Sequence, residues 1–254
     1  MKPYSQKEID LLREGGKRLA NILHTVAREV RPGVTTKELD TLAEKLIRDG
    51  GDEPAFLNYK PEGASRPYPA SLCVSVNNEI VHGLPGDRVL EQGDIVGLDL
   101  GLTHGGLVTD SAITVPVGNI SKEKQWLSDA TLGALHAGID AARAGNTIGD
   151  IGHAIEEFIK PYGYGLIEEL GGHGVGRKVH EEPFIANYGK KGTGMKLMPG
   201  VVIALEPMFT LGGKDVILAK DGFTFKTADR STSAHFEHTI LITDDEPEIL
   251  TQLQ

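Results

Sequence analysis

The sequence predicts an α+β fold in which two helix–helix–strand halves, related by a pseudo-twofold axis, share one sheet. Three observations lead to this prediction. Helical periodicity followed by strand-like runs occurs twice along the 254 residues. Short motifs of the first pass return in the same order in the second, and no Pro/Ser-rich spacer separates the passes. We therefore expect one domain over residues 1–254, with an internal duplication that relates residues 5–117 to residues 118–245.

Two predicted helices open the first half. Ser5 and Glu8 have the spacing of a capping box, and apolar residues recur at helical intervals after them until an Arg-Pro-Gly sequence interrupts the pattern. A second capping box at Thr35 and Glu38 precedes another helical pattern, which a pair of glycines closes. Residues 72–117 then form short apolar runs bounded by Gly, Pro and Asn, which is typical of strands.

The second half repeats this order. Residues 121–142 are helical in composition, residues 146–160 carry apolar side chains at helical spacing, and strand-like sequence follows to the end. Seven residues of the first half recur in the second half at one constant spacing: Arg31, Gly33, Thr35, Leu39, Glu44, Ile47 and Gly51 match Arg143, Gly145, Thr147, Ile151, Glu156, Ile159 and Gly163. In addition, segment 81–85 matches segment 179–183, and segment 93–99 matches segment 200–206. One such match can arise by chance, but three in the same order favour a duplication.

Composition excludes several classes of protein. Hydrophobic residues make up 39% and charged residues 24% of the chain, which is typical of globular proteins and not of disordered, coiled-coil or collagen-like ones. A net charge of −10 disfavours binding to nucleic acid or to acidic membrane surfaces. The single cysteine, Cys73, cannot form an intramolecular disulfide, and the charged first residues do not resemble a signal peptide. We therefore expect a cytoplasmic protein without a membrane-spanning segment.

Two aspartates in the first half indicate a cation site. Residues 96–115 have the pattern of a hairpin, and a turn centred between His104 and Gly105 would set Asp99 directly opposite Asp110. Directly opposed like charges destabilise a sheet, so such a pair calls for a cation. A solvent-facing pair in a slipped register is an equally good explanation of these two residues alone.

The second half supplies two more acidic residues. Glu206 follows an apolar run, and Glu237 opens another. Acidic residues beside such runs rarely stay unpaired. A single acidic residue of this kind is more often a structural residue held in a salt bridge. The duplication matches Asp99 with Glu206 and Asp110 with Glu237, which would bring four carboxylates together. Two divalent cations would compensate them, and oxygen donors favour manganese, iron or cobalt over a sulfur-ligated structural zinc. Two ions roughly 3.5–4 Å apart can share a hydroxide and polarise a carbonyl.

Histidines complete the predicted site. His173 lies in a glycine-rich stretch at 171–176, and we expect it to be the single nitrogen ligand. A dinucleotide-binding loop is the competing interpretation, but the following segment contains a proline and does not resemble a helix. His82 and His180 occupy matching positions in the two halves, which favours a role beside the metals, in contact with substrate or the tetrahedral intermediate. Either one alone could be a structural imidazole, as we expect of His24, His136 and His153.

The complete set of motifs closely resembles type I methionine aminopeptidases. The resemblance rests on segments 77–85, 171–183, 205–208 and 236–239 together with Asp99 and Asp110, and it covers nearly the whole chain. It implies a single catalytic domain with the α+β pita-bread fold, in which the two halves share a curved, mainly antiparallel sheet. In that fold two divalent ions (Mn, Fe, Co or Zn) activate a bridging hydroxide. The metal ligands that it implies are Asp99, Asp110, His173, Glu206 and Glu237. The short interval between the last two ligands favours type I over type II, which carries a long insertion there.

The resemblance also implies catalytic and substrate-binding residues. Glu206 would accept a proton from the attacking water, His180 would contact the scissile amide, and His82 would lie near the substrate's amine and the leaving nitrogen. A methionine pocket would comprise Phe56, Tyr59, Tyr68, Cys73, Val179 and Phe223. Relatives often carry an aromatic residue at the position of Val179 and Trp at that of Phe223, and segment 60–67 looks longer than usual. The pocket's tolerance for side chains other than methionine therefore stays open.

The reaction implied is removal of the initiator methionine from a peptide whose second residue is small. The expected partner is the N-terminus of a nascent polypeptide, close to the ribosome, with the enzyme acting as a monomer and without nucleic acid or membrane. Two alternatives stay open. One is a proline-specific aminopeptidase of the same fold, and the other is a catalytically silent pita-bread module that binds peptides.

Overall fold

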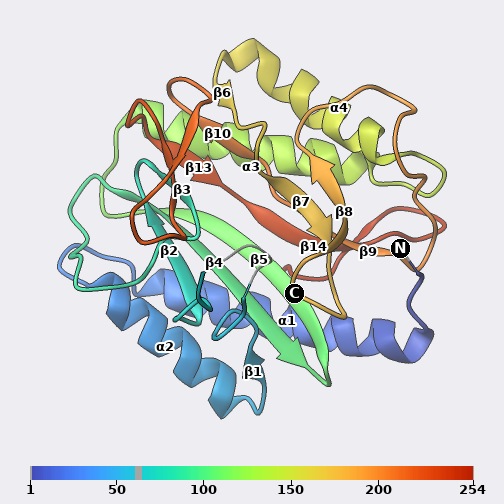
Figure 1. Ribbon diagram of the computed structural model, residues 1–254, viewed down its shortest axis with the longest axis horizontal. Coiled ribbons are helices and arrows are strands. Elements are labelled where there is room, and N and C mark those ends of the chain that lie inside the picture. Colours follow the sequence, from blue (N-terminus) through green and yellow to red (C-terminus); the bar gives the residue numbers. More distant parts are fainter. Residues whose placement is uncertain (1, 61–64, 254) are drawn as a thin grey trace.

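The computed structural model describes residues 2–60 and 65–253. Helices α1 and α2 run along one side of the strands in the view of Figure 1, and α3 and α4 run along the opposite side. The helical segments are α1 (Gln6–Arg28), α2 (Thr36–Asp49), α3 (Lys122–Ala141), α4 (Ile148–Ile159) and the 3₁₀ turn η1 (Lys160–Tyr162). No described helix has the length and apolar character needed to cross a membrane.

The strands form one large sheet and two small ones. In chain order they are β1 (Glu53–Pro54), β2 (Leu72–Val76), β3 (Glu79–Val81), β4 (Ile95–His104), β5 (Leu107–Pro116), β6 (Gly165–Leu166), β7 (Gly171–Gly174), β8 (Glu181–Ala186), β9 (Val202–Leu205), β10 (Met208–Thr210), β11 (Val216–Leu218), β12 (Phe225–Thr227), β13 (Ser233–His235), β14 (Glu237–Leu241) and β15 (Glu248–Ile249). The large antiparallel sheet has the order β1-β4-β5-β14-β9-β7-β8, with β2 beside β4 and β15 beside β14. The small sheets are β13-β10-β6 and β11-β12-β3.

Both predicted capping boxes of the first half are present. The Ser5 side chain accepts a hydrogen bond from Glu8 N–H, and Thr35 does the same with Glu38. Each box satisfies backbone donors that the first helical turn leaves free. The buried faces of α1 and α2 then pack on β2 and β4 in one hydrophobic cluster, while α3 and α4 pack with β9 and β14 in another.

The two halves share a backbone arrangement at the start of their second helices. Thr35 bridges Val89, and the matching Thr147 bridges Lys196. Gly33 and Gly145, the matched glycines that precede these bridges, both have φ of 92°, a value that favours glycine. We propose on this basis that the chain is one domain whose halves, residues 5–117 and 118–245, arose by duplication.

The register of the β4–β5 hairpin differs from our prediction. His104 pairs with Leu107, so the turn consists of Gly105 and Gly106, with φ of 57° and 83°. A two-residue turn of this kind needs positive φ at both central positions, which two glycines adopt without steric cost. Asp99 consequently faces Ala112, and Asp110 faces Gly101. The expectation that Asp99 and Asp110 lie directly opposite each other was wrong; they are diagonal neighbours on one face.

Candidate metal centre and substrate pocket

The register of the large sheet directs the predicted ligands to one face. Asp99 pairs with Ala112, and Ala112 in turn pairs with Glu237, so the two acidic residues flank a small alanine in one row across three strands. Asp110 stands two positions from Ala112 on β5 and therefore points to the same side. The methyl group of Ala112 leaves space between the longer acidic side chains.

The second row comes from the other half. His173 pairs with Ala204, and Ala204 pairs with Thr239, which lies two positions after Glu237 and shares its face. Glu206 lies two positions after Ala204, immediately beyond the end of β9. The strands β4, β5, β14, β9 and β7 are neighbours in the sheet (Figure 1). Their register therefore brings all five predicted ligands to the same side of the sheet.

These side chains are close enough to share metal ions. Asp110, His173 and Glu237 each offer a ligand atom, and the three atoms lie within 4.8 Å of one another. His173 Nε2 is 3.5 Å from Glu206 Oε1 and 3.9 Å from Glu237 Oε1. Asp99 completes the acidic cluster from β4 and remains only 8% exposed.

Burial makes this cluster electrostatically costly. It raises the pKa of Asp99 to about 7, with Glu206 adding to the rise, and raises the pKa values of Asp110, Glu206 and Glu237 well above the usual range. Four such carboxylates cannot all be ionised at neutral pH without positive charge beside them. Divalent cations would supply that charge.

The histidine is held in the form that binds a cation. Burial, together with the neighbouring imidazoles of His180 and His82, lowers the pKa of His173 to about 3, so the ring is neutral. His173 Nδ1 lies 2.9 Å from the carbonyl oxygen of Gly174, which assigns the N–H to that nitrogen. The lone pair of Nε2 then faces the acidic residues.

Three oxygen atoms strengthen the case that cations fit here. Asp99 Oδ1, Asp110 Oδ1 and Glu237 Oε1 are buried and have no hydrogen-bond partner among the residues that the structure describes. A buried acceptor without a partner carries the full cost of its lost hydration. Carboxylate oxygens with one imidazole nitrogen form a donor set that suits manganese, iron, cobalt or zinc.

A narrow cavity of about 50 Å³ lies against these side chains. It is lined by all six residues predicted for the methionine pocket, Phe56, Tyr59, Tyr68, Cys73, Val179 and Phe223, and by His82, His180, Asp99, Asp110, His173, Glu206 and Glu237. The Tyr68 and Phe223 rings meet edge to face at 5.3 Å. Residues 61–64 of the segment that looked long lie outside the described residues, but the guanidinium of Arg66 stacks 4.7 Å above the Phe223 ring.

The two matched histidines lie where this cavity meets a larger groove. The groove, of about 700 Å³, is also lined by His82, His173, His180 and Glu206, and it extends past Glu182 and Met208. The His180 ring meets that of His173 at 4.5 Å, and its Nδ1 is 3.1 Å from the hydroxyl of Tyr59. Burial lowers the pKa of His180 and lowers that of His82 to about 3, so both rings are neutral at pH 7.

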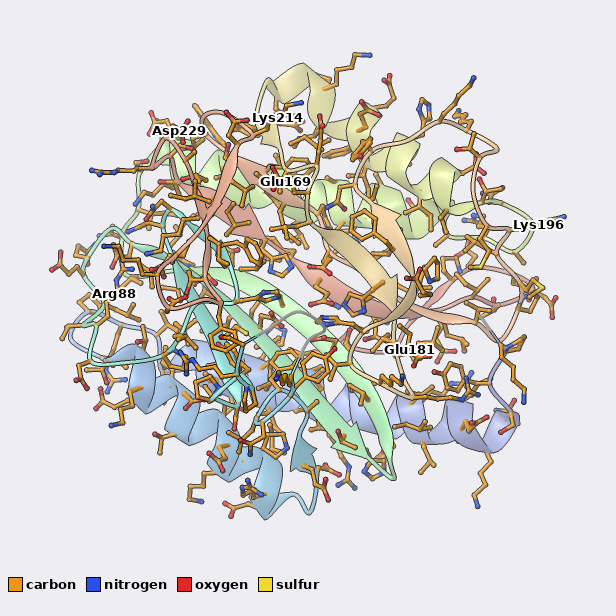
Figure 2. All side chains as sticks on the ribbon, in the orientation of Figure 1. Arg88, Glu169, Glu181, Lys196, Lys214 and Asp229 are labelled. Carbon is orange, nitrogen blue, oxygen red and sulfur yellow. The ribbon has the colours of Figure 1, made fainter. Side chains whose placement is uncertain are left out.

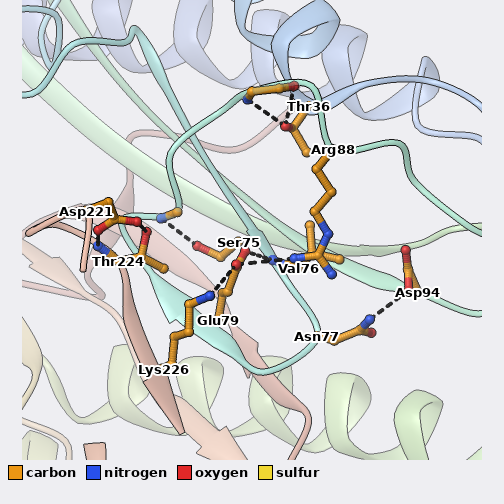
Figure 3. A network of polar contacts seen from close by, with 12 residues as sticks. Thr36, Ser75, Val76, Asn77, Glu79, Arg88, Asp94, Asp221, Thr224 and Lys226 are labelled. Atoms are coloured by element: carbon orange, nitrogen blue, oxygen red, sulfur yellow. Dashed lines mark hydrogen bonds and ion pairs between the residues drawn. The ribbon is translucent and has the colours of Figure 1, made fainter. Parts of the chain in front are cut away.

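A polar network supports the segment that presents His82 (Figure 3). Glu79 Oε2 accepts from Val76 N–H at 2.9 Å, while Glu79 Oε1 lies 3.0 Å from Lys226 Nζ and 3.2 Å from Arg88 Nη1. Beside it the Thr224 hydroxyl lies 3.4 Å from the carbonyl oxygen of His82. His82 has φ of 57°, an uncommon value for a residue other than glycine, and these contacts hold the backbone there.

One buried histidine at the site was not found from the sequence. His235 Nε2 lies 3.4 Å from Glu206 Oε2, and burial lowers the pKa of this imidazole to about 4. The hydroxyl of Thr114 fixes its backbone by accepting from His235 N–H and donating to His235 C=O. The signal that could have identified it is the two-residue spacing between His235 and Glu237 in extended chain.

Comparison with known proteins places the chain in a family. The model of metallopeptidase family M24 matches residues 10–244. The chain belongs to metallopeptidase family M24. It is 47% identical to a methionine aminopeptidase of Aquifex aeolicus and 42% identical to one of Clostridium perfringens, in each case over 98% of both chains.

Solved structures of M24 proteins agree. A methionine aminopeptidase from Rickettsia prowazekii superposes with a TM-score of 0.94 at 38% identity, covering 99% of both chains. A prolidase from Pyrococcus horikoshii has a TM-score of 0.75 at 24% identity, covering 99% of this chain and 64% of its own, and it shows the fold alone. The pita-bread fold and the resemblance to methionine aminopeptidases are therefore confirmed for this M24 protein.

Proposed function

We propose that this M24 protein is a metal-dependent methionine aminopeptidase that removes the N-terminal methionine from peptides with a small second residue. The observation that carries the proposal is the meeting of five candidate metal ligands, which lie on or immediately beyond five neighbouring strands, with a narrow aromatic cavity. Asp99, Asp110, His173, Glu206 and Glu237 would hold two divalent ions. When bound, such ions lower the pKa of water and polarise a peptide carbonyl.

The cavity and groove suggest how a peptide binds. The methionine side chain would enter the narrow cavity against Tyr68 and Phe223, and the second residue and the following chain would lie in the groove. Glu181 and Glu182 line that groove and contribute negative potential beside the positively charged peptide N-terminus. The net charge of −10 acts in the same direction.

Glu206 is suited to accept the proton of the attacking water. Its carboxylate lines both the narrow cavity and the larger groove, so it can take up a proton on one side and release it on the other. Burial raises the pKa of Glu206 well above its usual value, and cations held beside it would oppose that rise.

His180 and His82 would act on the peptide itself. A neutral imidazole can donate one N–H, and the hydroxyl of Tyr59 fixes the orientation of the His180 ring at Nδ1. His180 would stabilise charge that develops on the carbonyl oxygen, and His82 would contact the amine and the leaving nitrogen.

Two other functions have weaker support. A proline-specific peptidase shares the fold, but the likeness to a prolidase is limited to 24% identity, against 47% for a methionine aminopeptidase. A catalytically silent binding module would have no need for all five metal-ligand side chains, four of which form a buried acidic cluster.

We further propose that the protein is a cytoplasmic monomer that acts on nascent chains near the ribosome.

A peptide assay tests the function. Purified protein loaded separately with Mn, Fe, Co or Zn is given Met-Ala-Ser, a Met-Pro peptide and an Ala-Pro peptide. We expect turnover of the methionyl peptides, its loss on chelation, and its recovery on adding metal back. Cleavage of Ala-Pro alone would indicate the proline-specific enzyme, and no turnover with any of the four ions would favour the binding module.

A further inference from the structure

The loop between β7 and β8, residues 175–180, carries two residues of the site. Val179 lines the narrow cavity, and His180 lines both the cavity and the groove. Their positions depend on how this loop is held, because it leaves the β7–β8 ladder after Gly174 and rejoins it at Glu181. Glu181 Oε1 closes the loop by accepting from the backbone N–H groups of Arg177 and Lys178 at 2.6 and 2.9 Å.

Tyr4, which lies near the N-terminus of the chain, also holds this loop in place. The Tyr4 hydroxyl donates to the carbonyl oxygen of Val175 at 3.0 Å and accepts from Arg177 N–H at 3.0 Å. It also lies 3.4 Å from Glu181 Oε1. One side-chain oxygen thereby ties together the start, the middle and the end of the loop.

Tyr4 is itself firmly held. It is 8% exposed, its backbone N–H donates to Gly200 C=O at 2.8 Å, and the Arg177 guanidinium lies 4.0 Å from its ring centroid. Arg177 also forms an ion pair with Glu8 of α1 at 3.1 Å. Burial raises the pKa of Tyr4 to about 12, so the hydroxyl keeps its proton and remains a donor.

The loop backbone is shaped around this hydroxyl. Gly176 has φ of 132°, and a Cβ atom at this position would overlap the oxygen of Tyr4. On the other side Gly176 C=O accepts from Val108 N–H of β5 at 2.7 Å. The loop is therefore fixed between Tyr4 and the hairpin that carries Asp110. In the view of Figure 2, Glu181 lies between the β7–β8 strands and helix α1.

We propose that Tyr4 is a positioning residue for the methionine pocket, which acts through the 175–180 loop to set the places of Val179 and His180. The inference rests on the proposed function. Tyr4 does not line the cavity or the groove, so its effect would pass through the loop backbone. A looser loop would let Val179 move outward and widen the pocket, which would affect the choice of substrate. It would also misplace His180, which would affect turnover.

The test compares Tyr4→Phe with Tyr162→Phe, which removes a hydroxyl from a residue of η1 that is 50% exposed and lines neither the cavity nor the groove. For Tyr4→Phe we expect kcat/KM on Met-Ala-Ser to fall about tenfold, which lies within the roughly 10²-fold cost of misplacing a catalytic group by about 1 Å. The preference for Met-Ala-Ser over Leu-Ala-Ser should fall as well. Hydrogen exchange of segment 175–181, followed by mass spectrometry, should become faster only in Tyr4→Phe.

The outcomes separate this inference from the proposed function. If Tyr4→Phe merely lowers the melting temperature, and its substrate preference and loop exchange match those of Tyr162→Phe, Tyr4 is an anchor for the N-terminal segment and the inference is overturned. If the unmodified protein cleaves no methionyl peptide with any added divalent ion, the proposed function fails and the inference falls with it.

Discussion

The two halves of the site reach similar geometry by different routes. In the first half, Asp99 and Asp110 belong to one hairpin closed by a two-glycine turn, and the register leaves them diagonal. In the second half, β9 and β14 pair although strands β10 to β13 intervene in the sequence, and extending their register by one position sets Glu206 against Glu237. A local turn thus fixes one pair of acidic residues, whereas long-range pairing fixes the other.

The comparison teaches that register, more than motif, decides how carboxylates approach. Small residues make the close approach tolerable, because Ala112 separates Asp99 from Glu237 and Ala204 stands beside His173. The two pairs then share one buried volume, so any ion that one half holds would also contact the other. Four predictions examine this dependence.

The largest effect is expected from removing one acidic residue of either half. Asp99→Ala and Glu237→Ala should each reduce bound metal and abolish turnover of Met-Ala-Ser, because the halves share the ions. Metal content by elemental analysis and steady-state kinetics measure the two effects. If either variant kept full metal occupancy and activity, its residue would not be a ligand.

The matched histidines should show a smaller effect. His180→Ala should lower kcat by roughly 10²-fold, the scale of one lost oxyanion donor, while metal stoichiometry stays intact. His82→Ala allows the same measurement at the equivalent position of the first half. Loss of metal in the His180 variant would make that residue a ligand instead.

Removal of metal should make stability depend on pH above about 7.5. An unfolded histidine, whose ordinary pKa is about 6.5, is largely neutral there, and so are the folded His82 and His173, whose pKa values burial lowers to about 3. Burial raises the pKa of Asp99 to about 7 and those of Asp110, Glu206 and Glu237 well above their usual range, so in this pH range the folded state binds more protons than the unfolded chain. The free energy of unfolding should therefore fall as pH rises from about 7.5 towards about 9.

Thermal melts with and without a chelator measure this pH dependence. Asp99→Asn should flatten the slope, and an added divalent ion should remove it. Stability of the chelated protein that rises over the same pH range would show that the cluster is not protonated when folded and would contradict the prediction.

The smallest effect is expected at the matched helix caps. Thr35→Ala removes a hydroxyl that accepts from Glu38 N–H, and it should lower the free energy of unfolding by about 1 kcal/mol. The matching Thr147 hydroxyl makes no such bond and only donates to the Asp150 carboxylate, so Thr147→Ala should cost less. Chemical denaturation measures both costs, and kcat/KM should not change. A loss at Thr147 as large as that at Thr35 would contradict this difference between the two helix starts.

The sequence by itself determined the local elements and the identity of most groups at the site. Capping boxes, apolar periodicity and glycine turns depend on neighbouring residues, which is why the helices and the β4–β5 hairpin could be predicted. The five ligand candidates were named from their sequence patterns and the six pocket residues from the family resemblance, and together they line one cavity.

Only the tertiary structure decided the register and the contacts between distant segments. The turn centre moved by one residue because backbone φ, not charge, selects it. His235 meets Glu206, and Tyr4 meets the loop of His180, across many residues of chain. Such contacts leave no periodic trace in the sequence, because they depend on the strand order of the sheet and on which surfaces the folded backbone brings together.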